Sequence, residues 1–281
     1  AEGVKEIISN NYVLNKVIFH GFSGLGFILG IALLFFSPLE NGLPIRARYP
    51  FNTTIPPWQQ IAFGVETCTV LGGLLSIVAM DSLTTLKCSL ITTLFNVLNA
   101  NFENCTSRNE NTDKFCEGYE RKLNNKFHRR YKTCIQFHQR LVSMTNDYNR
   151  IYSSSMFVQM LSSTSMICLT GFQAVVVGGQ SSDIFKFGVY LSAAVSQLFY
   201  ACWIGNELSY ASTVVDRSLW LSDWHYENLQ SILQTFTLSM TFSRQPLVLK
   251  AGVFYVLSLQ TFIVIIKRSY SAFTLLNNMD V

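Results

Sequence analysis

Three ionisable residues lie within long apolar stretches of the chain, where a charged side chain is best placed to do chemistry. They are Glu66, Lys186 and Lys250. A charge at the centre of a membrane helix costs about 2.5–3.5 kcal/mol on insertion scales, so such residues need partners and often mark transport or binding sites. Lys250 lies near one end of its stretch, and its ammonium can reach the membrane interface. Glu66 lies deeper, and both a site role and a structural hydrogen bond are open for it.

Motifs of catalysis and of cofactor binding are missing from the sequence. It contains no G-x-x-x-x-G-K-[ST], no H-E-x-x-H, no G-x-S-x-G and no G-x-G-x-x-G beside a strand. The four histidines form no ligand cluster, and the seven cysteines never form a C-x-x-C. We therefore expect no enzyme, no metal site and no other cofactor.

The composition is typical of a chain that lies in a bilayer. Of 281 residues, 49% are hydrophobic and only 14% are charged, whereas an ordinary soluble domain has about 25% charged residues. Disorder is excluded, because it requires low hydrophobicity and high charge. The net charge of +4 is too small to indicate nucleic acid as a partner.

Five stretches are long and apolar enough to cross a membrane, which takes about 20 residues. They cover residues 13–37, 58–80, 151–177, 184–208 and 247–266, and the last continues apolar to residue 276. Before the third span, apolar residues recur mostly three or four positions apart from Tyr119 onward, which predicts one long helix entering the membrane. A second amphipathic stretch precedes the last span and is predicted to end at Pro246.

The basic residues predict the orientation of these spans. Eleven of the 21 Lys and Arg residues lie between Lys87 and Arg150, and such clusters stay in the cytoplasm. The N-terminal side is then cytoplasmic, and after five crossings the C-terminus is extracellular. Residues 38–57 fall outside the cell, where Asn52 begins an Asn-Thr-Thr glycosylation acceptor. A second acceptor at Asn104 disagrees, and the eleven basic residues outweigh it.

Several motifs of the C-terminal half point to one family. Residues 137–139 read FHQ, residues 197–208 read QLFYACWIGNEL, and residues 244–247 read RQPL. The closing residues 267–276 read KRSYSAFTLL. This pattern resembles the insect odorant receptors, a family of seven-helix proteins with a cytoplasmic N-terminus. The resemblance covers nearly the whole chain and is most specific from residue 134 onward.

The resemblance implies an all-α fold, a polytopic transmembrane helix bundle of the insect odorant receptor type with a helical cytoplasmic anchor layer. The five spans would be the family's third to seventh helices, with the first two missing. Residues 1–87 would hold two transmembrane helices and an extracellular loop, residues 88–150 a basic cytoplasmic helical segment, and residues 151–210 two more transmembrane helices. Residues 211–246 would form a cytoplasmic loop and an amphipathic helix, and residues 247–281 the pore-lining seventh helix with an extracellular C-terminus.

The same resemblance implies a function. The chain would be the odour-tuned subunit of a hetero-tetrameric odorant-gated cation channel, assembled with the odorant receptor coreceptor in the plasma membrane of olfactory sensory neurons. Its ligand would be a small volatile hydrophobic molecule. Leu275 and Met279 fall where the family's hydrophobic gate sits, and Asn278 lies beside them. The positions that would face the odorant pocket lie on three spans: Phe35, Phe36, Phe63, Thr67, Phe187, Tyr190 and Ala194.

Other readings stay open at this point. Each pocket and gate residue singly could be an ordinary core or lipid-facing residue. A gustatory receptor-type channel subunit is disfavoured because the stretch from Tyr255 to Phe262 departs from that family's closing T-Y and Q-F pattern. A G-protein-coupled receptor predicts a cytoplasmic C-terminus. A transporter that uses Glu66, Lys186 and Lys250 predicts an internal repeat, which the sequence lacks.

Overall fold

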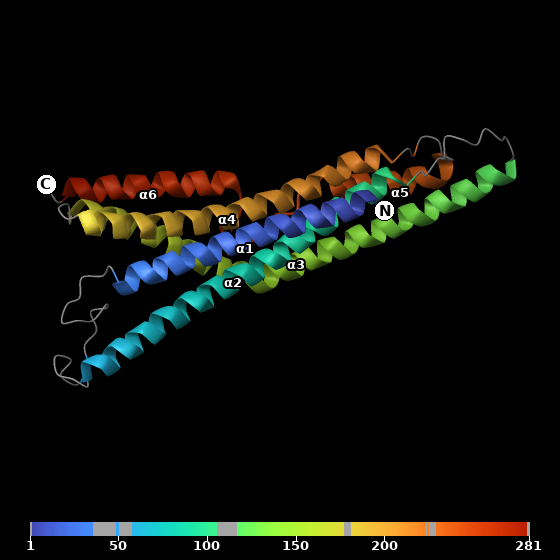
Figure 1. Ribbon diagram of the computed structural model, residues 1–281. Coiled ribbons are helices and arrows are strands. Elements are labelled where there is room, and N and C mark those ends of the chain that lie inside the picture. Colours follow the sequence, from blue (N-terminus) through green and yellow to red (C-terminus); the bar gives the residue numbers. More distant parts are fainter. Residues whose placement is uncertain are drawn as a thin grey trace. The chain divides into compact units, whose positions relative to one another are not determined.

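Helices make up almost all of the described chain. The computed structural model describes residues 2–35, 49–50, 58–105, 117–176, 181–222, 224 and 229–279. Its helices are α1 (Glu2–Phe35), α2 (Trp58–Glu103), α3 (Glu117–Val176), α4 (Ser181–Trp220), α5 (Leu229–Ser243) and α6 (Leu259–Met279) (Figure 1). Two short strands, β1 (Lys250–Ala251) and β2 (Tyr255–Val256), pair antiparallel. The predicted all-α fold class is confirmed.

The first four helices are longer than a membrane crossing requires. α2 has 46 residues and α3 has 60, so at 1.5 Å per residue each exceeds the roughly 30 Å hydrocarbon core. Three stretches of the described residues are long and apolar enough to cross a membrane: Trp58–Glu103, Phe127–Gln173 and Phe187–Trp220. They contain the predicted span at residues 58–80 and most of those at residues 151–177 and 184–208. The spans at residues 13–37 and 247–266 stay predictions.

The chain folds into two compact units. Unit 1 comprises Ala1–Leu14, Lys87–Phe157 and Cys202–Ser258, and unit 2 comprises Asn15–Leu86, Val158–Ala201 and Leu259–Val281. Each of the first four helices contributes to both units. Unit 1 therefore holds the whole of the predicted basic segment, residues 88–150, and unit 2 holds most of the residues of the predicted spans.

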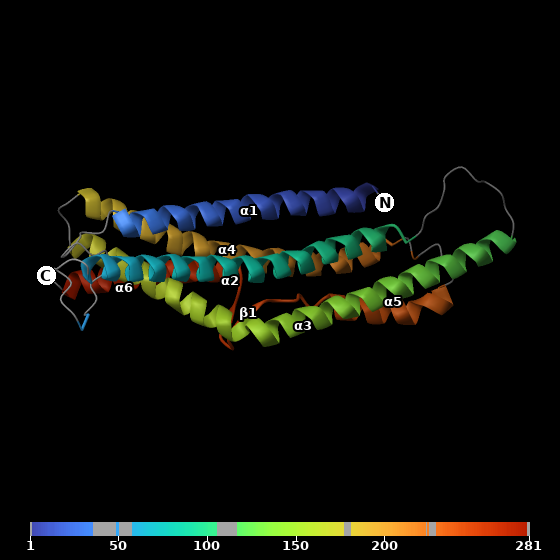
Figure 2. The same ribbon diagram turned by 60° about the horizontal axis from the view of Figure 1, so that its bottom comes forward.

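An aromatic cluster around Tyr131 forms the core of unit 1. Tyr131 of α3 is 2% exposed and stacks on Phe127, with ring centroids 5.7 Å apart. Phe102 of α2 meets the Tyr131 ring edge-on at 5.9 Å, and Phe236 of α5 lies 6.5 Å from it. Trp224 packs on Phe236 at 4.6 Å. Because such side chains bury 150–250 Å² each, this cluster joins α2, α3 and α5, and Figure 2 shows α5 alongside the N-terminal half of α3.

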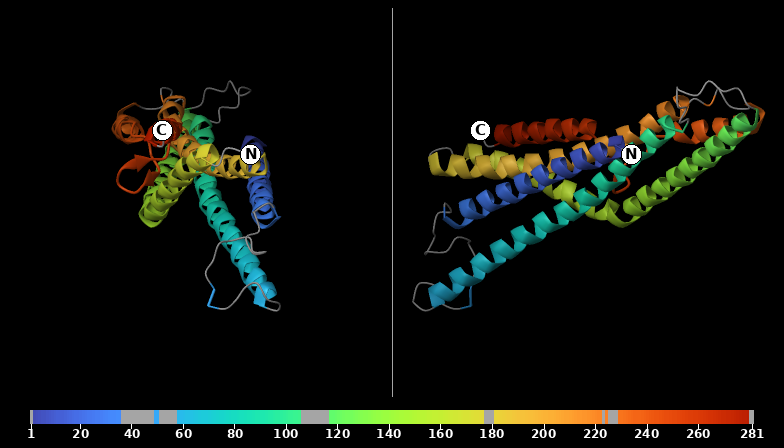
Figure 3. Two further views of the ribbon diagram at one scale, coloured as in Figure 1. Left: turned by 90° about the vertical axis from the view of Figure 1, so that its left-hand side faces the viewer. Right: turned by 45° about the vertical axis from the view of Figure 1, so that its right-hand side comes forward.

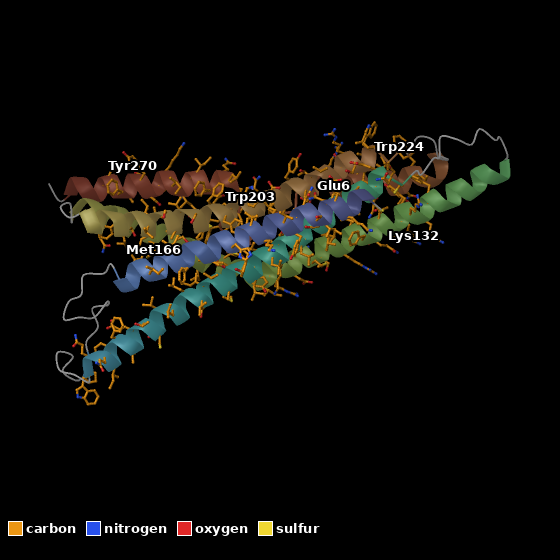
Figure 4. The ribbon with its side chains drawn as sticks, in the orientation of Figure 1. Glu6, Lys132, Met166, Trp203, Trp224 and Tyr270 are labelled. Carbon is orange, nitrogen blue, oxygen red and sulfur yellow. The ribbon has the colours of Figure 1, made fainter. Side chains whose placement is uncertain are left out.

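The long helix predicted from Tyr119 is confirmed as α3, which is amphipathic in unit 1. Lys132 projects outward from α3 in Figure 4, and Arg129 is exposed as well. Tyr131 and Cys134 point inward and are buried. The charged face suits water, because the apolar face is already covered by α2 and α5. The amphipathic helix before Pro246 is also confirmed, as α5.

The last predicted span begins later than the apolar run indicates. Residues 250–256 form the β1–β2 hairpin, and helix α6 starts only at Leu259. Gly252 makes the turn with a φ of 64°, a left-handed conformation that favours glycine. Gly205 of α4 lies where an added Cβ would be 2.4 Å from the Leu257 carbonyl oxygen. The segment that precedes α6 is therefore held against α4 in extended form, which a helix starting at Leu247 does not allow.

Unit 2 packs through small residues. A Cβ added to Gly26 or Gly30 of α1 would lie 3.1 Å from Val78 or Leu74 of α2. Glycine at a helix contact lets the two backbones approach closely, which is how helices associate in a membrane where burial of apolar groups provides no driving force. Large apolar side chains meanwhile face outward, and Phe27 is 70% exposed.

Candidate functional site

The predicted pocket residues that the structure describes lie on two helices of unit 2. α2 carries Phe63, which is 40% exposed, and Thr67, which is half-buried. α4 carries Phe187 and Tyr190, which are half-buried, and Ala194, which is 8% exposed. Residues three or four apart share one face of a helix, so the three α4 positions form one stripe.

The α2 and α4 sets do not touch through polar or ring contacts. Within the described ranges, no hydrogen bond or aromatic contact joins them, and Figure 3 shows the first turns of α2 running clear of α4. Thr67 Oγ1 instead donates to the Phe63 carbonyl oxygen of its own helix at 2.8 Å. Phe35 ends α1 and its side chain lies outside the described residues, as does all of Phe36. The pocket stays a prediction.

Glu66 lies on the same turns of α2 as Phe63 and Thr67 and has a polar partner. Its side chain is 4% exposed, and the Tyr49 hydroxyl donates to its Oε1 at 2.9 Å. Burial and the nearby carboxylate raise the pKa of the Tyr49 phenol, which keeps this donor protonated at neutral pH. Of the two roles left open for Glu66, the structure supplies the structural hydrogen bond.

A polar network that the sequence analysis missed joins three helices of unit 2. Asp81 of α2 accepts hydrogen bonds from Gln159 Nε2 of α3 and from Gln197 Nε2 of α4, both at 2.5 Å. Each carboxylate oxygen serves one amide, and hydrogen bonds to a charged group contribute about 1.5–3 kcal/mol. Gln159 is a polar residue inside a predicted span, and this is the sequence feature that could have indicated the network. Asp81 follows the predicted second span by one residue and carries no motif.

The predicted gate residues lie in the last turns of α6. Leu275 is 62% exposed. Asn278 and Met279 end the helix, and their side chains lie outside the described residues. Leu275 and Met279 are four residues apart and share a face. That face suits both a pore lining and a lipid contact, so the gate stays a prediction.

Of the remaining positions of interest, the structure describes the surroundings of Lys250 and His138. Asn52 and the side chain of Lys186 lie outside the described residues. Lys250 is exposed and lies in β1, not in a membrane helix as predicted, because the hairpin precedes α6. His138 packs edge-on against Phe95 at 6.2 Å, and burial lowers its pKa. His138 therefore packs within unit 1.

Sequence comparisons point to odorant receptors. Residues 4–270 match the family model described as 7tm Odorant receptor. Odorant receptor Or1 of Anopheles gambiae is 30% identical over 148 residues, which are 52% of this chain and 36% of that protein. Odorant receptor 82a of Drosophila melanogaster is 23% identical over 266 residues, which are 92% of this chain and 65% of that protein. The chain thus spans less than two thirds of either relative.

Structural comparison gives the same fold. The insect olfactory receptor OR5 from Machilis hrabei, solved in complex with eugenol, superposes with a TM-score of 0.78 at 14% identity, over 99% of this chain and 70% of that one. The receptor without eugenol also superposes with a TM-score of 0.78. The helical fold is therefore that of this receptor. Because the family model matches nearly the whole chain, the chain belongs to the insect odorant receptor family.

Proposed function

We propose that the chain is the odorant-binding subunit of an odorant-gated cation channel, assembled with the odorant receptor coreceptor as a hetero-tetramer. The observation that carries this proposal is the family match over residues 4–270. The fold shared with a receptor solved in complex with eugenol supports it. The matching family model and the relatives described above are odorant or olfactory receptors, and we therefore prefer this function to a G-protein-coupled receptor, a transporter or a gustatory receptor.

The ligand is a small volatile hydrophobic molecule that binds near Phe63, Tyr190 and Ala194. Apolar and aromatic side chains supply affinity for such ligands, which offer few hydrogen bonds. The polar groups on the adjoining turns of α2 are already paired, because Glu66 accepts from Tyr49 and Thr67 donates to its own helix. They therefore add little affinity for a polar ligand. Ala194 is the smallest residue of the α4 stripe and is buried.

The basic segment lies in the cytoplasm, the N-terminal side is cytoplasmic and the C-terminus is extracellular. Eleven of the 21 Lys and Arg residues lie between Lys87 and Arg150, and positive charge of this kind stays inside. An epitope tag after Val281 is then accessible to antibody on intact cells, and a tag in residues 106–116 is accessible only after permeabilisation. The reverse labelling would contradict the orientation.

α6 lines the pore, with Leu275 and Met279 as a hydrophobic constriction and Asn278 beside them. Such constrictions gate by dewetting, because water and ions leave a narrow apolar passage. The exposure of Leu275 supports this assignment, since a pore-lining residue has few contacts within its own chain.

The test is whole-cell current during application of an odorant panel, with the full-length protein expressed with and without an insect coreceptor. We expect an odour-evoked cation current only when both proteins are present. Current from the chain alone would contradict the heteromeric assembly. Absence of current when both proteins are at the cell surface, across a broad panel, would contradict the odorant-gated function.

A further inference from the structure

The tip of the β1–β2 hairpin holds two large apolar side chains away from the rest of unit 1. Val253 is 92% exposed and Phe254 is 82% exposed, the highest values among the large hydrophobic residues that the structure describes. The strands on either side are in register, with Lys250 opposite Val256 and Ala251 opposite Tyr255. An ordered turn thus presents both side chains outward, and an exposed apolar pair of this kind calls for a partner.

The hairpin is fixed to α3, so its tip cannot turn inward. Gly252 N donates to the Ser153 carbonyl oxygen at 2.8 Å, and Ser153 Oγ donates to the Gly252 carbonyl oxygen at 3.1 Å. Lys250 N donates to Asn149 Oδ1 at 3.0 Å. The ring of Phe157 lies 3.1 Å from where a Cβ on Gly252 would be, which closes the inner side of the turn. Figure 2 shows β1 alongside α3.

Two chain segments place the hairpin at the level where the protein enters the membrane. Ser153 and Phe157 lie in the first two turns of the predicted third span, within a helix that is apolar and long enough to cross. Val256 precedes the first residue of α6, Leu259, by three positions (259 − 256), which is at most about 10 Å of extended chain. The tip therefore lies within reach of the interfacial layer of the bilayer.

Cationic and aromatic side chains occupy the same level. Lys250 is exposed, and it shares the outer face of the hairpin with its cross-strand partner Val256, because side chains alternate along a strand. Lys87 lies over the Tyr152 ring, 4.9 Å from its centroid, and donates to the Tyr152 hydroxyl. Aromatic residues and lysines gather at membrane interfaces, and anionic headgroups attract the lysines.

We propose that the hairpin tip is a lipid-binding element. Val253 and Phe254 insert among the acyl chains just below the headgroups, and Lys250 contacts the phosphate of an anionic phospholipid. This proposal rests on the proposed function in two respects only, namely that α6 crosses the membrane and which leaflet the hairpin tip contacts. A lipid fits better than a second protein surface, because the tip lies at the membrane entry and an exposed lysine adjoins it.

Photocrosslinking identifies the occupant. The full-length protein with p-benzoylphenylalanine in place of Phe254 is assembled with the coreceptor in nanodiscs of phosphatidylcholine and phosphatidylserine, irradiated and analysed by peptide mass spectrometry. Trp220 is the matched control position, because it is aromatic, 59% exposed and in the same unit, and it lies 12 residues beyond the predicted fourth span (220 − 208). We expect a phospholipid adduct at position 254 and none at position 220.

Either a protein adduct at position 254 or no adduct there from a correctly assembled complex would overturn the proposal. Lys250→Gln tests the headgroup contact, and we expect it to remove any enrichment of phosphatidylserine over its share in the nanodisc. An unchanged enrichment would overturn the role of Lys250. Because adducts are read without any odorant, failure of odorant gating leaves this result interpretable.

Discussion

The two units of the chain use their apolar side chains in opposite ways. The twelve largest fully buried side chains of the described residues all lie in unit 1, among them Phe95, Phe102 and Tyr131. Unit 2 instead exposes side chains such as Phe27 at 70% and Leu75 at 71%. Unit 1 therefore has a packed core, and its most exposed large apolar side chains, Val253 and Phe254, lie at the hairpin tip. Unit 2 has no such core among the described residues and exposes its large apolar side chains along its helices.

We attribute this difference to the solvent that we propose for each unit, which is water for unit 1 and lipid for unit 2. In water, burial of apolar area drives association and large aromatic residues dominate the core. In lipid, the helices gain nothing from burying apolar groups, so close glycine contacts and interhelical hydrogen bonds hold them together. Unit 2 has both, in Gly26 and Gly30 of α1 and in the Asp81 network. Equivalent substitutions should therefore have different effects in the two units.

The largest difference is expected between two phenylalanines. Phe102→Ala opens a cavity in the aromatic cluster of unit 1, where Phe102 is 1% exposed, and should lower the free energy of unfolding by about 3–5 kcal/mol. Phe27→Ala in unit 2 removes a side chain that is 70% exposed, and should change stability by no more than about 0.5 kcal/mol. Denaturant unfolding of the full-length protein in detergent measures both. Equal losses would contradict the contrast between the units.

Of the two aspartates Asp81 and Asp147, we expect Asp81 of unit 2 to have the larger effect on stability when it is substituted. Asp81→Ala leaves the half-buried amides of Gln159 and Gln197 without their acceptor, at a total cost of about 1–3 kcal/mol. The control is Asp147→Ala in unit 1, which breaks an exposed ion pair to Arg150 and should cost at most about 0.5–1 kcal/mol. Thermal unfolding of the two variants in nanodiscs compares them. A larger effect at Asp147 would show that the network does not hold unit 2 together.

Two glycines of α4 sharpen the contrast along one helix. Gly205→Ala in unit 1 places a Cβ 2.4 Å from the Leu257 carbonyl oxygen and should cost about 1–3 kcal/mol. Gly188→Ala in unit 2 meets nothing within 4 Å and should stabilise the helix by up to about 1 kcal/mol. The measurement is the midpoint of thermal unfolding. Opposite shifts are expected, and a stabilising Gly205→Ala would contradict the close approach of Leu257 to α4.

The smallest expected effect is a dependence of unit 1 on pH. Burial lowers the pKa of His138 in the folded protein, whereas the unfolded value is about 6.5. The unfolded chain then binds more protons, so the stability from neutral His138 is present above pH 6.5 and is lost as the pH falls toward the folded pKa. His138→Gln should flatten the fall in melting temperature between pH 7.5 and 5.5. The exposed His128→Gln is the control, and an equal effect of both substitutions would refute the assignment.

The sequence predicted the helices and their class well, because period and hydropathy are local properties. The long α3 and the amphipathic α5 followed from apolar spacing and from Pro246. The start of α6 was wrong by twelve residues (259 − 247), because the apolar run does not reveal that Gly252 turns and that Leu257 packs on Gly205. These are tertiary contacts between α3, α4 and the hairpin, which spacing alone cannot encode.

The site was less predictable than the fold. The pocket and gate positions came from family resemblance, and side chains such as Phe63 and Leu275 have no local pattern that separates a ligand contact from a lipid contact. The Asp81 network was not predicted, because Gln159 and Gln197 lie 78 and 116 residues from Asp81 along the chain. One carboxylate and two distant glutamines can be identified as a hydrogen-bond network only when the positions of the three helices are known.

The central claim is that unit 2 recognises the odorant, and one substitution tests it directly. Ala194→Phe enlarges the smallest side chain of the α4 stripe, at a position that is 8% exposed and belongs to unit 2. The measurement is the dose–response curve of the odour-evoked current, recorded with the coreceptor and an odorant that activates the wild-type protein. We predict a shift of the half-maximal concentration of at least about tenfold, which is about 1.4 kcal/mol, with the same surface expression. An unchanged curve for odorants of every size would contradict odorant binding at this face of unit 2.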